Sequence, residues 1–116
     1  MTRLAAIANR HPGGFFEIPP EGAAPNLADF RLIDVREPDE FVGPLGHIPG
    51  AELVPMGNVL EHAGGWDRTR PVLLICRSGA RSGHVAAALA PMGYPHLYNL
   101  IGGRLVWNEL GLPVER

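Results

Sequence analysis

The sequence contains no lysine and only one cysteine among its 116 residues. The lack of lysine removes that side chain from any catalytic scheme. A single cysteine cannot form a disulfide within the chain, and it excludes zinc sites built on cysteine pairs. No segment approaches the ~20 consecutive apolar residues of a membrane span. The N-terminal "MTRLAAIANRHPGG" is too short in its apolar part for a signal peptide. A cytoplasmic protein without a membrane partner is expected.

The charge balance also excludes a class of partner. Ten cationic and twelve anionic side chains give a formal net charge of −2, which does not favour binding to a nucleic acid. The length is that of one domain, large enough to bury a core without metal or disulfide bonds. Neither a cofactor nor a metal is expected.

The chain divides into an irregular part and a regular part. Residues 9–30 carry four prolines and three glycines, so residues 1–30 are predicted to be an irregular arm, with "FFEI" at most a short edge strand. From residue 31 onward, strands alternate with helices, which predicts an α/β domain over residues 31–116. The expected strands are 31–36, part of 46–55, 71–76 and 96–102, and the expected helices are 37–43, 56–65, 82–91 and 103–111. This order predicts a mostly parallel sheet of four to five short strands with helices on both faces.

The segment "CRSGARS", Cys76 to Ser82, joins the strongest strand to a helix. Backbone N–H groups of such a loop and the helix dipole favour a negative charge on the sulfur. Gly79 lets the backbone turn tightly, and two arginines add positive charge. Thiols in such settings have pKa values lowered to ~3.5–7.5. The loop is therefore expected to hold a thiolate beside an anionic substrate.

A structural interpretation of Cys76 has to be weighed against this one. A lone cysteine at the end of an apolar strand is more often a small buried hydrophobic residue than a nucleophile. Arginines on a surface loop are usually solvated. A structural cysteine, however, requires no glycine, no small residues and no flanking arginines, so the combination favours a functional thiol.

The quoted motifs resemble those of the single-domain rhodanese (thiosulfate sulfurtransferase-like) family. The matching segments cover roughly residues 31–114 in the order of the family: "LIDVREPDEF", "GHIPGA", "VLLICRSGARS", "GY" and "NLIGGRLVWNELGLPV". The resemblance implies the rhodanese-like fold. It also implies an enzyme in which Cys76 takes a sulfane sulfur from a small anionic donor such as thiosulfate. The resulting Cys76 persulfide would pass that sulfur to cyanide or to a thiol.

The resemblance and the loop positions together suggest roles for neighbouring residues. The backbone from Arg77 to Ser82 would hold the persulfide. Arg77 would point outward toward the donor, while Arg81 would turn inward with Asp34 as its carboxylate partner. Arg36 would line the mouth of the pocket. The complete expected loop is Cys76, Arg77, Ser78, Gly79, Ala80, Arg81 and Ser82, supported by Asp34 and Arg36.

Two other functions remain open from the sequence. Cysteine phosphatases and arsenate reductases use a similar loop, but with arginine six positions after cysteine, whereas Arg81 lies five positions after Cys76. The second alternative is a sulfur-carrier or regulatory module that keeps the fold and acts with a protein sulfur donor or acceptor.

Overall fold

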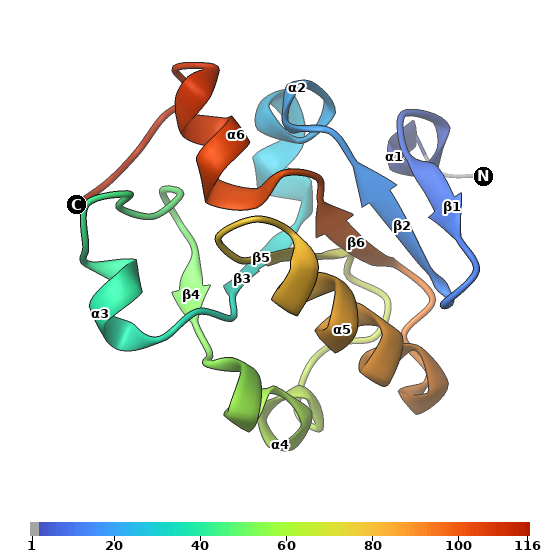
Figure 1. Cartoon of the computed structure of the whole chain (residues 1–116). Coiled ribbons are helices and arrows are strands. Elements are labelled where there is room, and N and C mark those ends of the chain that lie inside the picture. Colours follow the sequence, from blue (N-terminus) through green and yellow to red (C-terminus); the bar gives the residue numbers. More distant parts are fainter. Residues whose placement is uncertain (1–2) are drawn as a thin grey trace.

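The computed structural model describes residues 3–116, which form one sheet with helices packed against it (Figure 1). The strands are β1 (Asn9–His11), β2 (Phe15–Ile18), β3 (Arg31–Asp34), β4 (Glu52–Leu53), β5 (Val72–Ile75) and β6 (Leu97–Leu100). Their spatial order is β1-β2-β6-β5-β3-β4. Neighbouring strands are parallel except β1 and β2, which are antiparallel. The expected mostly parallel α/β sheet is confirmed.

The helices are short, and most of them lie in the connections between strands. The α-helices are α1 (Arg3–Ala6), α2 (Pro20–Ala23), α3 (Pro38–Phe41), α4 (Val59–Ala63), α5 (Ala80–Leu89) and α6 (Gly103–Glu109). Three 3₁₀ segments add η1 (Ala24–Asp29), η2 (Met56–Asn58) and η3 (Ala90–Met92). Within residues 3–116, no helix has the length and apolar character needed to cross a membrane.

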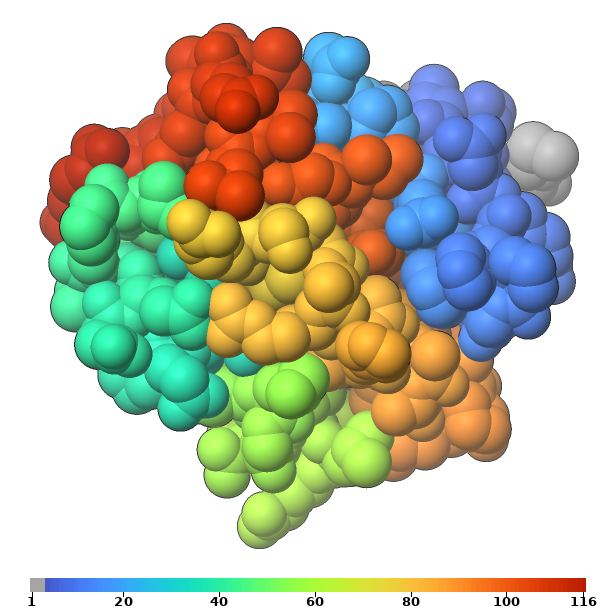
Figure 2. All heavy atoms as spheres, in the orientation of Figure 1, coloured from blue at the N-terminus to red at the C-terminus, as the bar shows by residue number. Residues whose placement is uncertain are grey.

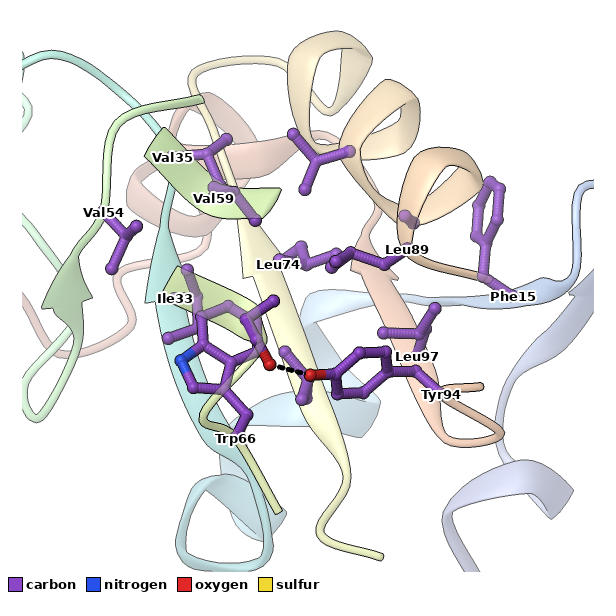
Figure 3. Close-up of a cluster of buried hydrophobic side chains, with 14 of the residues drawn as sticks. Phe15, Ile33, Val35, Val54, Val59, Trp66, Leu74, Leu89, Tyr94 and Leu97 are labelled. Atoms are coloured by element: carbon purple, nitrogen blue, oxygen red, sulfur yellow. Dashed lines mark hydrogen bonds between the residues drawn. The ribbon is translucent and has the colours of Figure 1, made fainter. Parts of the chain in front are cut away.

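The sheet separates two hydrophobic clusters because side chains alternate along each strand. On β5, Val72 and Leu74 belong to the cluster under α4 and α5, and Leu73 and Ile75 belong to the cluster on the side of α6. Figure 3 shows the first of these clusters, with Leu74 at its centre. All four residues of β5 are buried, as in a strand covered on both faces. Helices therefore cover both faces, as expected.

The sheet has six strands, one or two more than expected, because residues 9–18 are not irregular. Phe15 and Ile18, 4% and 0% exposed, are buried in opposite clusters, so β2 pairs with β6 inside the sheet and β1 forms the edge. The prolines do not interrupt these strands. Pro19 and Pro20 follow β2, where Pro20 begins α2, a position that suits proline.

Candidate active site

The loop that contains Cys76 lies at the carboxyl end of β5. This strand pairs with β3 on one side and β6 on the other, so the loop is above the middle of the sheet. Gly79 caps the N-terminus of α5 with φ +101°, a left-handed conformation that glycine adopts without strain. The sequence therefore forms the expected strand, tight loop and helix in this order.

The Cys76 sulfur accepts hydrogen bonds from within the loop. The Gly79 N–H donates to Sγ at 3.0 Å, and the Ser82 hydroxyl lies 3.3 Å from Sγ. Burial alone raises the pKa of the Cys76 thiol. Hydrogen bonds from the Ser82 side chain and from the backbone N–H groups of Ser82, Gly79 and Ser78 outweigh this effect, so the pKa is lower than that of an ordinary thiol. The geometry thus favours the thiolate.

The loop is fixed from the opposite side by the start of α6. The backbone N–H groups of Arg104 and Leu105 donate to the carbonyl oxygens of Cys76 and Arg77 at 2.9 and 3.1 Å. Gly103 makes this close approach possible, because a Cβ at this position would lie 2.4 Å from the Cys76 oxygen. The segment "GGR" therefore positions the loop as well as beginning a helix.

Asp34 and Arg36 form a buried ion pair with each other, which corrects the role expected for Asp34. Arg36 Nε donates to Asp34 Oδ1 at 2.9 Å, and Nη2 donates to Oδ2 at 2.7 Å. Nη2 also donates to the Gly46 oxygen at 2.8 Å. The two side chains are 1% and 0% exposed. Asp34 is therefore not the partner of Arg81, because the nearer guanidinium at the end of β3 occupies both of its oxygens.

Arg81 instead pairs with Glu40 of α3. Its Nη1 and Nη2 donate to the two Glu40 carboxylate oxygens at 2.7 and 2.8 Å. The Arg81 bond lowers the pKa of Glu40 to about 2, with smaller contributions from the Glu37 backbone N–H and the Arg36 charge. The same bond raises the pKa of Arg81. Arg81 therefore connects the start of α5 to α3, as a brace with a different partner from the one expected.

The surface around the loop contains a hollow of about 320 Å³. It is lined by Arg36, Glu40, Pro44, Leu45 and Arg77. Arg77 is exposed, as expected, whereas Arg36 contributes to the wall from a buried position. Figure 2 shows the loop (gold) at the surface between the α3 segment and the α6 segment. A small anion in this hollow would meet the guanidinium of Arg77.

The sulfur itself is nearly closed off from solvent, since Cys76 is 1% exposed. Ser78 and Ala80 are exposed on the outside of the loop. Little of Cys76 is therefore open to a reagent in this conformation of the loop. Among residues 3–116, no group of three or more histidine, cysteine or acidic side chains is placed to hold a metal ion.

Two residues of this site, Asn99 and Glu40, were not among those expected from the sequence. Asn99 on β6 is 3% exposed, and its side chain contacts both Ser82 and the Gly79 oxygen. A signal was present, because an amide inside the apolar run "HLYNLIG" has to find partners when the strand is buried. Glu40 has no comparable signal in the sequence, because its role as the partner of Arg81 depends on tertiary packing.

Comparisons with known proteins identify the family of this chain. A family model described as rhodanese-like domain matches residues 21–110. The chain is 38% identical to a protein named sulfurtransferase from Allochromatium vinosum, over 84% of this chain and 92% of that protein. It is 34% identical to the thiosulfate sulfurtransferase GlpE of Actinobacillus succinogenes, over 87% and 91% of the two chains. The uncharacterized protein YqhL of Bacillus subtilis is 42% identical over 67% of this chain, but the match spans only 60% of YqhL.

Solved structures show the same fold. A rhodanese-related protein from Thermoplasma volcanium superposes with a TM-score of 0.79 at 27% identity, covering 85% of this chain and 96% of that one. A rhodanese-like domain protein from Staphylococcus aureus gives a TM-score of 0.73 at 25% identity, covering 86% and 98%. The family model and the relatives cover most of this chain, and the chain belongs to the rhodanese-like domain family.

Proposed function

We propose that this protein is a sulfurtransferase that carries a sulfane sulfur on Cys76 as a persulfide. The observation that supports this proposal most directly is the Cys76 sulfur, held by the Gly79 N–H and beside the Ser82 hydroxyl in a loop that lowers its pKa. Membership in a family whose relatives include proteins named thiosulfate sulfurtransferase adds independent support. Because the thiol has to stay reduced between turnovers, a reducing compartment such as the cytoplasm is the expected location.

The first half of the reaction forms the persulfide. The Cys76 thiolate attacks the outer sulfur of thiosulfate, a new S–S bond forms, and the S–S bond of the donor breaks. The electron pair of that bond leaves with sulfite. One negative charge from the thiolate and two from thiosulfate become one on the outer persulfide sulfur and two on sulfite. The N–H groups of the loop from Arg77 to Ser82 would hold that outer sulfur.

The second half returns the sulfur to an acceptor. Cyanide in the test tube, or a thiolate in the cell, attacks the outer sulfur, and Cys76 leaves as a thiolate. A cysteine with a lowered pKa is the better leaving group in this step. The same hydrogen bonds that make Cys76 an available nucleophile therefore also assist its departure.

A protein donor or acceptor is the second candidate. The near-complete burial of Cys76 favours it, because contacts with a docked protein can compensate the cost of opening the loop. The putative sulfur carrier protein YrkF of Bacillus subtilis is 32% identical over 67% of this chain, although the match spans only 41% of YrkF. The site lends no such support to a phosphatase, because Arg81 lies five positions after Cys76 and its guanidinium is held by Glu40.

A comparison of donors tests this proposal. Thiosulfate, polysulfide and a cysteine-desulfurase persulfide are each supplied to the protein, and transfer to cyanide or to a thiol is measured. Turnover with thiosulfate would support an enzyme that uses a small sulfur donor. Slow transfer from both small donors together with fast transfer from the protein-bound persulfide would instead identify a sulfur carrier. Lack of transfer from all three would contradict the proposal.

A further inference from the structure

Three buried polar side chains lie in series beneath the loop. Ser82 Oγ lies 3.3 Å from Cys76 Sγ and 2.5 Å from Asn99 Oδ1. Cys76, Ser82 and Asn99 are 1%, 0% and 3% exposed. Competition from bulk water for these hydrogen bonds is therefore small, and the three groups have to satisfy one another.

The orientation of Asn99 is fixed by its amide nitrogen. Nδ2 donates to the Gly79 oxygen at 3.1 Å and to Glu17 Oε2 at 3.4 Å. Because Nδ2 donates to the Gly79 oxygen and to Glu17, the other end of the amide, Oδ1, faces Ser82. Asn99 is thus a fixed acceptor, supported from β2 as well as from the loop.

Ser82 has one hydroxyl proton and two acceptors for it. While the sulfur is neutral, the hydrogen bond to Asn99 is favoured, because an amide oxygen is a good acceptor and a thiol sulfur is a weak one. Once the sulfur is ionised, a bond to the charged sulfur is favoured, since hydrogen bonds to ionised groups are roughly twice as strong as neutral ones. The proton then has to leave Asn99.

We propose that Asn99 is a positioning residue that holds the Ser82 hydroxyl beside Cys76 and competes with the sulfur for its single proton. The hydrogen-bond competition itself stands on these contacts alone. Its place in a reaction cycle rests on the proposed sulfur transfer.

In that cycle the hydroxyl changes partner twice. It donates to Sγ when Cys76 is a thiolate, and it turns to Asn99 when Sγ becomes the inner sulfur of the persulfide and its charge moves to the outer sulfur. When the acceptor removes the outer sulfur, negative charge returns to Sγ, and the hydroxyl turns back. No proton enters or leaves the site in either turn, because the Ser82 hydroxyl only rotates about its C–O bond.

The loop has supports other than Asn99. The Gly79 oxygen also accepts from the Gly83 N–H at 3.1 Å, and α6 holds the carbonyls of Cys76 and Arg77. The charged side chains around the loop include Arg77 of the loop itself, Glu17 of β2, Glu40 of α3, Arg81 of α5, Arg104 of α6 and the pair Asp34 and Arg36. Variants at Asn99 and Ser82 leave all of these charges unchanged.

The test measures the ionisation of Cys76 without any sulfur donor. Because Cys76 is the only cysteine, the pH dependence of alkylation by iodoacetamide reports its thiolate fraction directly. Asn99→Leu removes the competing acceptor at similar size. It is expected to raise the thiolate-to-thiol ratio about three- to tenfold at a given pH, the value of one neutral hydrogen bond. Ser82→Ala is expected to lower this ratio.

The double variant distinguishes positioning from a general structural role. In the Ser82→Ala background, Asn99→Leu is expected to have no effect on the ratio, because no hydroxyl remains to be shared. A ratio that falls or stays constant in Asn99→Leu would overturn the inference, and so would an equal rise in both backgrounds.

A second measurement requires no variant at Asn99. In the unaltered protein, the NMR signals of the Asn99 side-chain amide are expected to shift with the same pH midpoint as Cys76 ionisation, and to lose this shift in Ser82→Ala. Amide chemical shifts that do not change at the pH midpoint of Cys76 ionisation would contradict the inference. If these results are as expected but no persulfide forms with any donor, the proposed function fails and the hydrogen-bond competition stands.

Discussion

Arg81 and Glu40 form a two-point ion pair that connects the beginning of α5 to α3, with nitrogen–oxygen distances of 2.7 and 2.8 Å. Glu40 Oε1 also accepts from the Glu37 N–H at 3.1 Å, as part of a capping box at the start of α3. One carboxylate thus closes a helix end and holds the arginine of the Cys76 loop. Loss of the Glu40 carboxylate would therefore affect both the start of α3 and the Cys76 loop.

Replacement of Glu40 by glutamine is expected to destabilise the protein in a pH-dependent way. The pKa of Glu40 is lowered to about 2, so the stabilisation is complete above the ordinary pKa near 4.5 and is lost as the pH falls toward 2. Because the Arg81 and Glu40 side chains are 33% and 28% exposed, we expect a difference of only about 1 kcal/mol near neutral pH.

Urea unfolding of the unaltered protein and of Glu40→Gln at several pH values measures this difference. Asp39→Asn, in the same turn of α3, is the matched control for the loss of one negative charge. A stability difference that persists unchanged at the lowest pH would show that the ion pair is not its source.

Gly103→Ala is expected to destabilise the protein for two reasons. The alanine would be strained in a left-handed backbone conformation, and its Cβ would also displace the Cys76 loop. Gly103 and Gly111 both have positive φ, at +56° and +70°, but only at Gly103 would a Cβ meet the carbonyl oxygens of Cys76 and Arg77, at 2.4 and 2.6 Å. Gly111→Ala should cost about 1–2 kcal/mol from its left-handed backbone alone. Gly103→Ala should cost clearly more and slow the alkylation of Cys76. Equal losses of stability in the two variants would contradict this explanation.

Asp34→Asn is expected to be strongly destabilising, although the change is small in volume. It leaves the guanidinium of Arg36 buried without a counter-charge, which costs about 3–5 kcal/mol in comparable cases. Glu52→Gln is the control, because Glu52 pairs with Arg31 in an exposed position at 2.8 Å and should contribute about 0–1 kcal/mol. Denaturant unfolding of both variants decides this prediction, and similar losses would argue against it.

Arg77→Ala is expected to weaken donor binding more than chemistry. Arg77 is exposed and lines the hollow beside the loop, so its charge attracts an anionic donor and is screened by salt. For thiosulfate we expect KM to rise about three- to tenfold at low ionic strength with kcat nearly unchanged. Arg10→Ala removes an exposed charge on β1 as the control. A fall in kcat with unchanged KM would assign Arg77 to the chemical step instead.

The sequence predicted the parts of this structure that depend on local signals. The strand "PVLLI", the tight turn at Gly79 and the helix after it follow from hydrophobic runs, a glycine and helical spacing, and they place Cys76 correctly. The partner expected for Arg81 was wrong, since Arg81 pairs with Glu40 and not with Asp34. Two acids, Asp34 and Glu40, can pair with two arginines, Arg36 and Arg81, in two ways. Only the tertiary contact between α3 and α5 determines which pairing forms.

The N-terminal strands were hidden for a different reason. Proline and glycine outnumber the apolar residues around "FFEI", so the local composition predicts a loop. β2 is stabilised by its parallel pairing with β6, more than 80 positions later in the chain, with Phe16 opposite Tyr98. A pairing over such a distance leaves no local pattern. Because β2 also supplies Glu17 to Asn99, this segment contributes to the candidate site as well as to the sheet.

Intact-mass spectrometry after brief exposure to thiosulfate tests the central claim, that Cys76 carries a transferable sulfur, most directly. The protein is expected to gain the mass of one sulfur atom, to lose it on treatment with cyanide or a reducing thiol, and to gain nothing as Cys76→Ser. A polysulfide and a desulfurase-bound persulfide serve as further donors in the same measurement. A protein that remains at its unmodified mass with every donor, while its fold is intact, would contradict the account.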